Sequence, residues 1–193
     1  MTIKRIVLLG ASLLSFSAFA HVGHHDGQHG FVEGFLHPLT GLDHMAYILA
    51  VGLAIAFAVP KLNWHYLIGY VAVLSLGLVA GLIGITASML ELVLASSVLL
   101  AGLTVAIAKV DKICWLVSFT ILGASFHGLA HASEMPVGIS TLAYFSGLLL
   151  SSVSLLVFAG SVARWIDARE LPVIRYVLGV SFSALGSIFL FLQ

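Results

Sequence analysis

Histidine and carboxylate side chains are grouped at two places in this 193-residue chain. The members are His37, Asp43 and His44 in the first group, and His127, His131 and Glu134 in the second. Residues three, four or seven apart share a face of a helix, so each group would present its side chains together. Imidazole nitrogens with carboxylate oxygens suit Ni²⁺, Co²⁺, Zn²⁺ or Cu²⁺, whereas Cu⁺ prefers sulfur and Mg²⁺ prefers oxygen alone. These residues are therefore candidate metal ligands.

Two alternatives stay open for these groups. The histidines could be structural, buried and satisfied by hydrogen bonds between helices, with Asp43 paired to one of them. Glu91 could line the same cavity as the two groups or stand apart from it.

A further set of histidines lies in a polar, glycine-rich stretch near the start of the chain. Its members are His21, His24, His25 and His29. Such a composition suits a segment that collects metal ions. If cleavage makes His21 the first residue, it could chelate through its α-amine together with its ring. A solvated spacer is the alternative interpretation.

The elements that must position these groups are membrane helices. Hydrophobic residues make up 61% of the chain and charged residues only 8%, whereas a soluble domain carries roughly 25% charged residues. The apolar residues form blocks of about twenty, the length that crosses a hydrocarbon core of ~30 Å. We therefore expect an all-α, polytopic membrane protein with six spans. They cover residues 38–59, 64–84, 87–108, 113–133, 137–162 and 172–192.

The first twenty residues have the pattern of a cleavable signal peptide. Lys4 and Arg5 precede a short apolar core, and Ala18-Phe19-Ala20 forms a small-x-small cleavage site. An uncleaved first helix is the alternative. The chain is accordingly divided into a signal peptide (1–20), a histidine-bearing periplasmic segment (21–36) and a six-helix transmembrane domain (37–193).

The positive charges predict the orientation. If the mature N-terminus is periplasmic, every lysine and arginine lies before the cleavage site, in the first, third or fifth connection, or just inside the last span. They are Lys4, Arg5, Lys61, Lys109, Lys112, Arg164, Arg169 and Arg175. This agrees with the positive-inside rule, so both mature termini should be periplasmic and the protein should be multi-pass in a bacterial inner membrane. Both metal-ligand groups then lie at the outer end of their spans.

Two longer motifs carry a family resemblance. His37-x5-Asp43-His44 followed by Met45 to Gly52, together with Phe126-His127-Gly128-Leu129-Ala130-His131-x-x-Glu134, resembles the HupE/UreJ family over essentially the whole chain. The resemblance implies a permease for nickel, sometimes cobalt, associated with hydrogenase and urease maturation. It places the family's motif residues on the six residues named first. Ala132 departs from the family pattern, which usually has glycine there.

The expected function is thus inward transport of Ni²⁺ or Co²⁺, bound transiently, by a protein that is not an enzyme and has no prosthetic group. A zero net charge excludes a nucleic-acid partner, and the single Cys114 excludes disulfides and a cysteine-based zinc site. The partners are the metal ion and the lipid bilayer, and a homo-oligomer stays open. Two alternatives are an intramembrane zinc hydrolase, although His-Glu-x-x-His is absent, and a bis-histidine haem protein.

Overall fold

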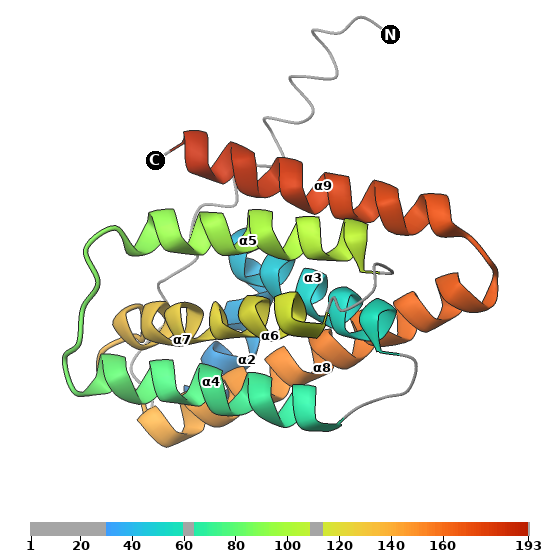
Figure 1. Ribbon diagram of the computed structural model, residues 1–193. Helices are drawn as coiled ribbons and strands as arrows, with labels where there is room; N and C mark the ends of the chain where they lie inside the picture. The colour runs from blue at the N-terminus through green and yellow to red at the C-terminus, as the bar shows by residue number, and fades with distance from the viewer. Residues whose placement is uncertain (1–29, 60–63, 109–113, 193) are drawn as a thin grey trace, which may run out of the picture.

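The computed structural model describes residues 30–59, 64–108 and 114–192, and the regular elements in this part of the chain are all helices, with no strand. The helices run largely side by side along one axis (Figure 1). They are α2 (Gly30–Thr40), α3 (Leu42–Ala58), α4 (Trp64–Leu82), α5 (Leu90–Ile107), α6 (Cys114–Leu122), α7 (Ala124–Ser133), α8 (Thr141–Ala168) and α9 (Pro172–Phe191). The expected signal peptide and the histidines at 21, 24, 25 and 29 lie outside the described residues.

Four of these helices, α4, α5, α8 and α9, are long and apolar enough to cross a membrane, and α2 with α3 makes a fifth span if this bent pair counts as one. The chain is therefore a multi-pass membrane protein. The expected fourth span, 113–133, corresponds to α6 and α7, which are separated at Gly123. There the Tyr47 hydroxyl donates to the Thr120 carbonyl at 2.6 Å, and a side chain on Gly123 would crowd this hydroxyl. A side chain inserted in this way interrupts the regular hydrogen-bond ladder.

The first expected span differs from the prediction at its start. Pro38 was expected to begin the helix, but it lies inside α2, which begins at Gly30. A proline inside a helix removes its own N–H and crowds the carbonyl four residues earlier, yet α2 continues past Pro38 to Thr40. The Oγ1 of Thr40 lies 3.1 Å from the His37 carbonyl, which it can satisfy as the helix ends. The break is at Gly41, which is extended (φ −78°, ψ 110°).

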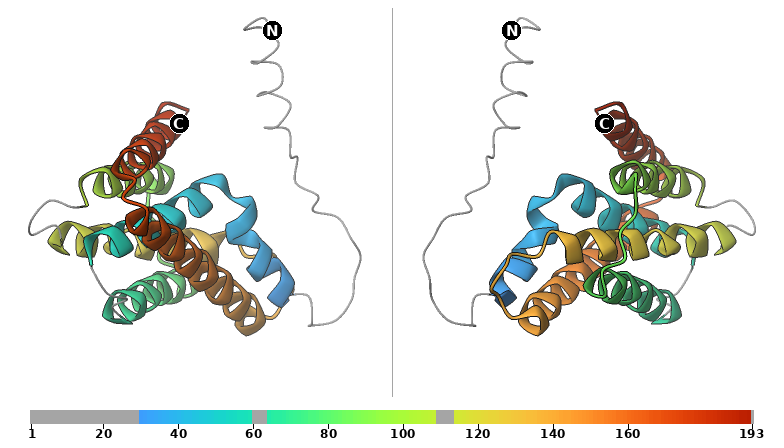
Figure 2. Two further views of the ribbon diagram at one scale, coloured as in Figure 1. Left: turned by 90° about the vertical axis from the view of Figure 1, so that its right-hand side faces the viewer. Right: turned by 90° about the vertical axis from the view of Figure 1, so that its left-hand side faces the viewer.

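The bend at Gly41 turns α3 by 76° relative to α2. Figure 2 shows the two helices meeting at this angle, with α2 lying against the first part of α8. The contact is close because Gly34 lies on the Tyr144 backbone and Gly147 on the Phe31 backbone, where a Cβ would collide. Small residues thus let the backbones approach, as is common between membrane helices.

The α4–α7 pair is built in the same way. A Cβ on Gly77 would collide with the Ser125 carbonyl, and a Cβ on Gly128 would collide with the Leu74 carbonyl. This contact holds α7, which carries the second histidine group, against α4.

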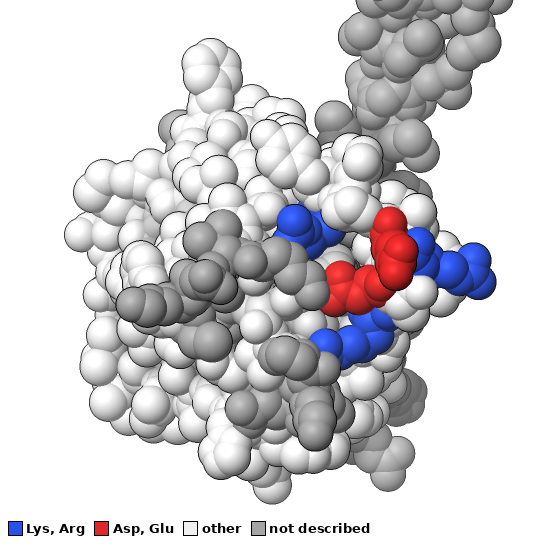
Figure 3. All heavy atoms as spheres, turned by 45° about the vertical axis from the view of Figure 1, so that its right-hand side comes forward, with Lys and Arg blue, Asp and Glu red and all other residues white. Residues whose placement is uncertain are grey.

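Charged side chains are divided between the two ends of the bundle. Arginines and acidic residues lie next to one another at the end where α8 stops and α9 starts (Figure 3). Arg164 Nη2 donates to the Val59 carbonyl at 2.7 Å, which ties the end of α8 to the end of α3. At the other end, the first turns of α3 and α5 and the last turn of α7 bring carboxylates and histidines together.

Candidate metal centre

Four of the six residues predicted as ligands converge on one point. Each of them offers one ligand atom, and these atoms lie within 4.8 Å of one another. The four are His37, His44, His131 and Glu134. Donors that bind one ion at about 2.1 Å lie at most ~4.2 Å apart, so small side-chain rotations would bring all four within reach of a single cation. We call them the four-residue group.

The bend at Gly41 brings the first two members together. His37 lies in the last turn of α2 and His44 in the first turn of α3, and their ring centroids are 5.8 Å apart. The shared face of one continuous helix, which the seven-residue spacing predicted, is therefore not what unites them. The change of direction between two helices does so instead.

The end of α7 supplies the other two members. His131 lies in its last turn and Glu134 is its C-cap residue. The His131 ring centroid is 4.3 Å from that of His44 and 4.9 Å from that of His37, in edge-to-face arrangements. Three imidazoles from three helices thus surround one point, and His44 and His131 are buried.

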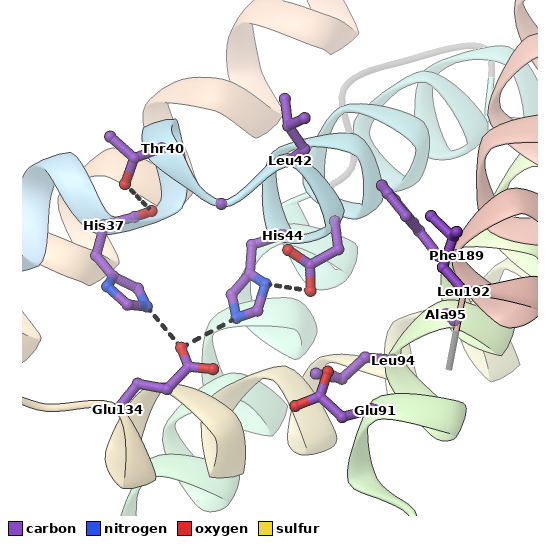
Figure 4. Close-up of a pocket in the computed structure, with 12 residues that line it drawn as sticks. His37, Thr40, Leu42, His44, Glu91, Leu94, Ala95, Glu134, Phe189 and Leu192 are labelled. Atoms are coloured by element: carbon purple, nitrogen blue, oxygen red, sulfur yellow. Dashed lines mark hydrogen bonds and ion pairs between the residues drawn. The ribbon is translucent and has the colours of Figure 1, made fainter. Parts of the chain in front are cut away.

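Glu134 connects the histidines of the first motif. Its Oε2 lies 2.9 Å from His37 Nε2 and 3.8 Å from His44 Nε2 (Figure 4). The Glu134 side chain is 41% exposed, so the carboxylate faces the opening of the site. A cation entering there would meet the one negative charge of the group first.

Asp43 lies behind His44 and outside the four-residue group. Its Oδ2 is 2.8 Å from His44 Nδ1. A carboxylate at this nitrogen favours the tautomer with the proton on Nδ1 and leaves the Nε2 lone pair free. Asp43 therefore orients His44, and it does not share the point on which the four ligand atoms converge.

His127, the sixth predicted ligand, is buried one turn deeper on α7 than His131. Its ring stacks on Tyr47 with centroids 4.0 Å apart and planes 11° apart, and its Nε2 lies 2.8 Å from Ser97 Oγ. It contacts the four-residue group through His44, at 5.0 Å between ring centroids. The structure thus separates His127 from the residues with which its motif groups it.

A cavity of about 850 Å³ opens beside the group, lined by His37, Asp43, His44 and Glu134. Glu91 lines it too, which agrees with the interpretation that it shares the cavity of the two motifs. Figure 4 shows Glu91 across the cavity from His44. Phe189 and Leu192, at the end of α9, line the cavity beside them. A hydrated cation could therefore reach the four-residue group from this end.

Sequence reasoning missed the neighbours that hold the histidines in place. Ser97 and Tyr47 both contact His127, and the buried Tyr144 ring lies 5.9 Å from that of His37. Tyr47 follows His44 by three residues, and that helical spacing was a usable signal. Ser97 carries no signal in the sequence, because serines recur along these spans.

Comparison with known proteins gives two matches that include both motifs. A family model described as HupE / UreJ protein matches residues 9–189. Protein HupE of Rhizobium leguminosarum bv. viciae is 33% identical over 186 residues, which cover 95% of each chain. No solved structure matches the chain significantly.

Proposed function

Since this chain belongs to the HupE/UreJ family, we propose that it is a membrane permease that imports Ni²⁺ or Co²⁺. The observation that carries the proposal is the convergence of three imidazoles and one carboxylate beside an open cavity. These donors suit borderline divalent cations, and they include neither the sulfur that Cu⁺ prefers nor the all-oxygen set that Mg²⁺ prefers. The metal is the cargo, and no prosthetic group is needed.

The exposure of the group suits transient binding. Glu134 and His37 have side chains that are 41% and 26% exposed, whereas His44 is 5% exposed. An ion bound here keeps contact with the cavity on one side and with buried ligands on the other. A permease must capture its ion and then release it, so a partly open site serves it better than a closed structural one.

The proposed topology has six spans, with α2 plus α3 and α6 plus α7 as broken spans. The arginine-bearing end of α8 and α9 then faces the cytoplasm, as the positive-inside rule requires, and the cavity faces the periplasm of a bacterial inner membrane. The signal peptide would be removed, and the histidine segment from His21 to His29 would precede α2 at the cavity end and collect ions there.

The proposed role is supply of metal for hydrogenase- or urease-type maturation, as the family resemblance implies. A bis-histidine haem is disfavoured by the packing of the rings. The His37, His44 and His131 rings contact one another edge to face, which leaves no space for a porphyrin between any two of them.

The proposal is tested by metal uptake in cells that produce the protein. Radioactive nickel or cobalt should accumulate with the wild-type protein, and His131→Ala should abolish uptake because it removes one ligand and opens the buried side of the group. Ser133→Ala is the matched control on α7, since Ser133 Oγ donates to the Ala130 carbonyl of its own helix. Membrane insertion of each variant is measured in parallel. Wild-type uptake in an inserted His131→Ala variant would refute the proposed site.

A further inference from the structure

A second arrangement of polar groups lies directly beneath the four-residue group. It consists of His127 on α7, Ser97 on α5 and Tyr47 on α3, all buried. Its contact with the four-residue group runs through the His44 and His127 rings. Because α7 ends at the cavity, His127 lies one helical turn further into the bundle than His131.

Ser97 connects a backbone carbonyl of α5 to an imidazole nitrogen of His127. Ser97 Oγ lies 2.7 Å from the Leu94 carbonyl and 2.8 Å from His127 Nε2. When the single hydroxyl hydrogen is donated to the Leu94 carbonyl, which can only accept, the hydroxyl oxygen is left to accept from His127. This arrangement places the imidazole proton on Nε2.

The other nitrogen of His127 is left with a lone pair. A neutral imidazole protonated on Nε2 has its acceptor on Nδ1, and the buried His127 Nδ1 has no hydrogen-bond partner among the described residues. Leaving such a buried atom without a partner is unfavourable. Stacking on Tyr47, which is itself held by its bond to the Thr120 carbonyl, fixes the ring in place. In this tautomer the lone pair on Nδ1 meets no donor among the described residues.

We propose that Ser97 is a positioning residue for inward transfer of the divalent cation, which keeps His127 Nδ1 as the acceptor that takes the ion from the four-residue group. The inference rests on the proposed function. The four-residue group holds the ion with a carboxylate and three imidazoles, whereas His127 adds one neutral nitrogen without a charge. Transfer to it therefore loosens the ion and passes it toward the middle of the bundle.

Further buried hydroxyl groups follow Ser97 along α5. Thr104 lies seven residues after Ser97 on α5, on the same face, and its Oγ1 is 3.0 Å from the buried Thr120 Oγ1 of α6. Oxygen atoms of this kind can take the place of lost hydration around a cation. The buried hydroxyls thus extend inward from the point where His127 receives the ion.

The tautomer is measured on the full-length, metal-free protein in lipid nanodiscs, by the ¹⁵N chemical shifts of its histidines, assigned with His127→Gln. We expect the wild-type His127 to carry its proton on Nε2, and Ser97→Ala to lose this preference. Ser96→Ala is the matched control, because the neighbouring Ser96 is partly exposed and its Oγ donates to the Leu92 carbonyl of its own helix. A wild-type His127 protonated on Nδ1 would overturn the inference whether or not the protein transports metal.

Transport is measured as uptake of radioactive nickel into closed lipid vesicles that contain the same full-length protein. Ser97→Ala should lower the maximal uptake rate about tenfold or more, in the range for loss of a partner that orients a ligand, while the KM for nickel changes less than about twofold because the four-residue group is intact. Ser97→Thr, which keeps the hydroxyl, should restore the rate. An unchanged maximal rate in Ser97→Ala, despite a changed tautomer, contradicts the inference. No uptake by the wild-type protein would instead refute the permease itself.

Discussion

The two ends of the bundle carry charge in different ways. At the cavity end, Asp43 and Glu134 face imidazoles. A neutral imidazole does not cancel the negative charge of a carboxylate. At the opposite end, arginines bring permanent positive charge beside acidic side chains (Figure 3), and Arg175 lines a hollow there together with Asp167 and Glu170. The zero net charge of the chain therefore hides an asymmetric molecule. If the proposed function holds, the cavity end would bind the dication, and the arginines at the opposite end would not attract it.

The largest effect that would sharpen this comparison is expected from Glu134→Gln. It removes the only negative charge of the four-residue group with little change of shape, so nothing offsets a dication at a partly desolvated site. Nickel affinity of the purified protein should fall by at least about 100-fold, more than for loss of an orienting partner. Glu170→Gln, the same change at the opposite end, should leave affinity unaltered. Equal losses in both variants would contradict the proposed difference between the ends.

An intermediate effect is expected from Asp43→Asn. The carboxylate holds His44 Nδ1 at 2.8 Å from outside the four-residue group, so nickel affinity should fall by roughly 10–100-fold, as for other partners that orient a ligand. Titration of the purified variant with nickel measures this, with Asp167→Asn as the control at the arginine end. Complete loss of binding would show that Asp43 ligates the ion directly.

The smallest effect on binding is expected from Arg164→Gln. The guanidinium donates to the Val59 carbonyl at the end of α3, far from the cavity, so nickel affinity should change less than about twofold. Thermal unfolding in detergent should still report the loss of a charged hydrogen bond, worth about 1.5 kcal/mol or more. A large drop in affinity would mean that the two ends are coupled through α3.

The all-helical fold was predictable from the sequence, because apolar blocks are a local signal, and histidine spacing indicated four residues that the structure brings together. The path of the first span was not predictable. Pro38 is the more conspicuous helix breaker, yet the bend is at Gly41, where α2 leaves α8 and α3 turns into the bundle. The position of the bend depends on how α2 packs against α8. A local sequence pattern does not contain this information.

The separation of His127 from the four-residue group was also beyond local reasoning. His127 and His131 are one turn apart on the same face, and only the neighbours on other helices distinguish them. Ala132 shows the opposite case, in which a departure from the family pattern is absorbed by its surroundings. Its methyl group faces Gly81 across the α4–α7 contact, and the missing side chain there makes room for it.

The position of the four-residue group at one end of the bundle has an electrical consequence. In the proposed orientation, an ion captured there has crossed little of the bilayer, so nearly the whole membrane potential acts on its later movement. A potential of 100 mV, negative inside, is worth about 2.3 kcal/mol per elementary charge, and hence about 4.6 kcal/mol for a dication. Capture should accordingly be almost independent of voltage, whereas the movement inward from the cavity end is driven by it.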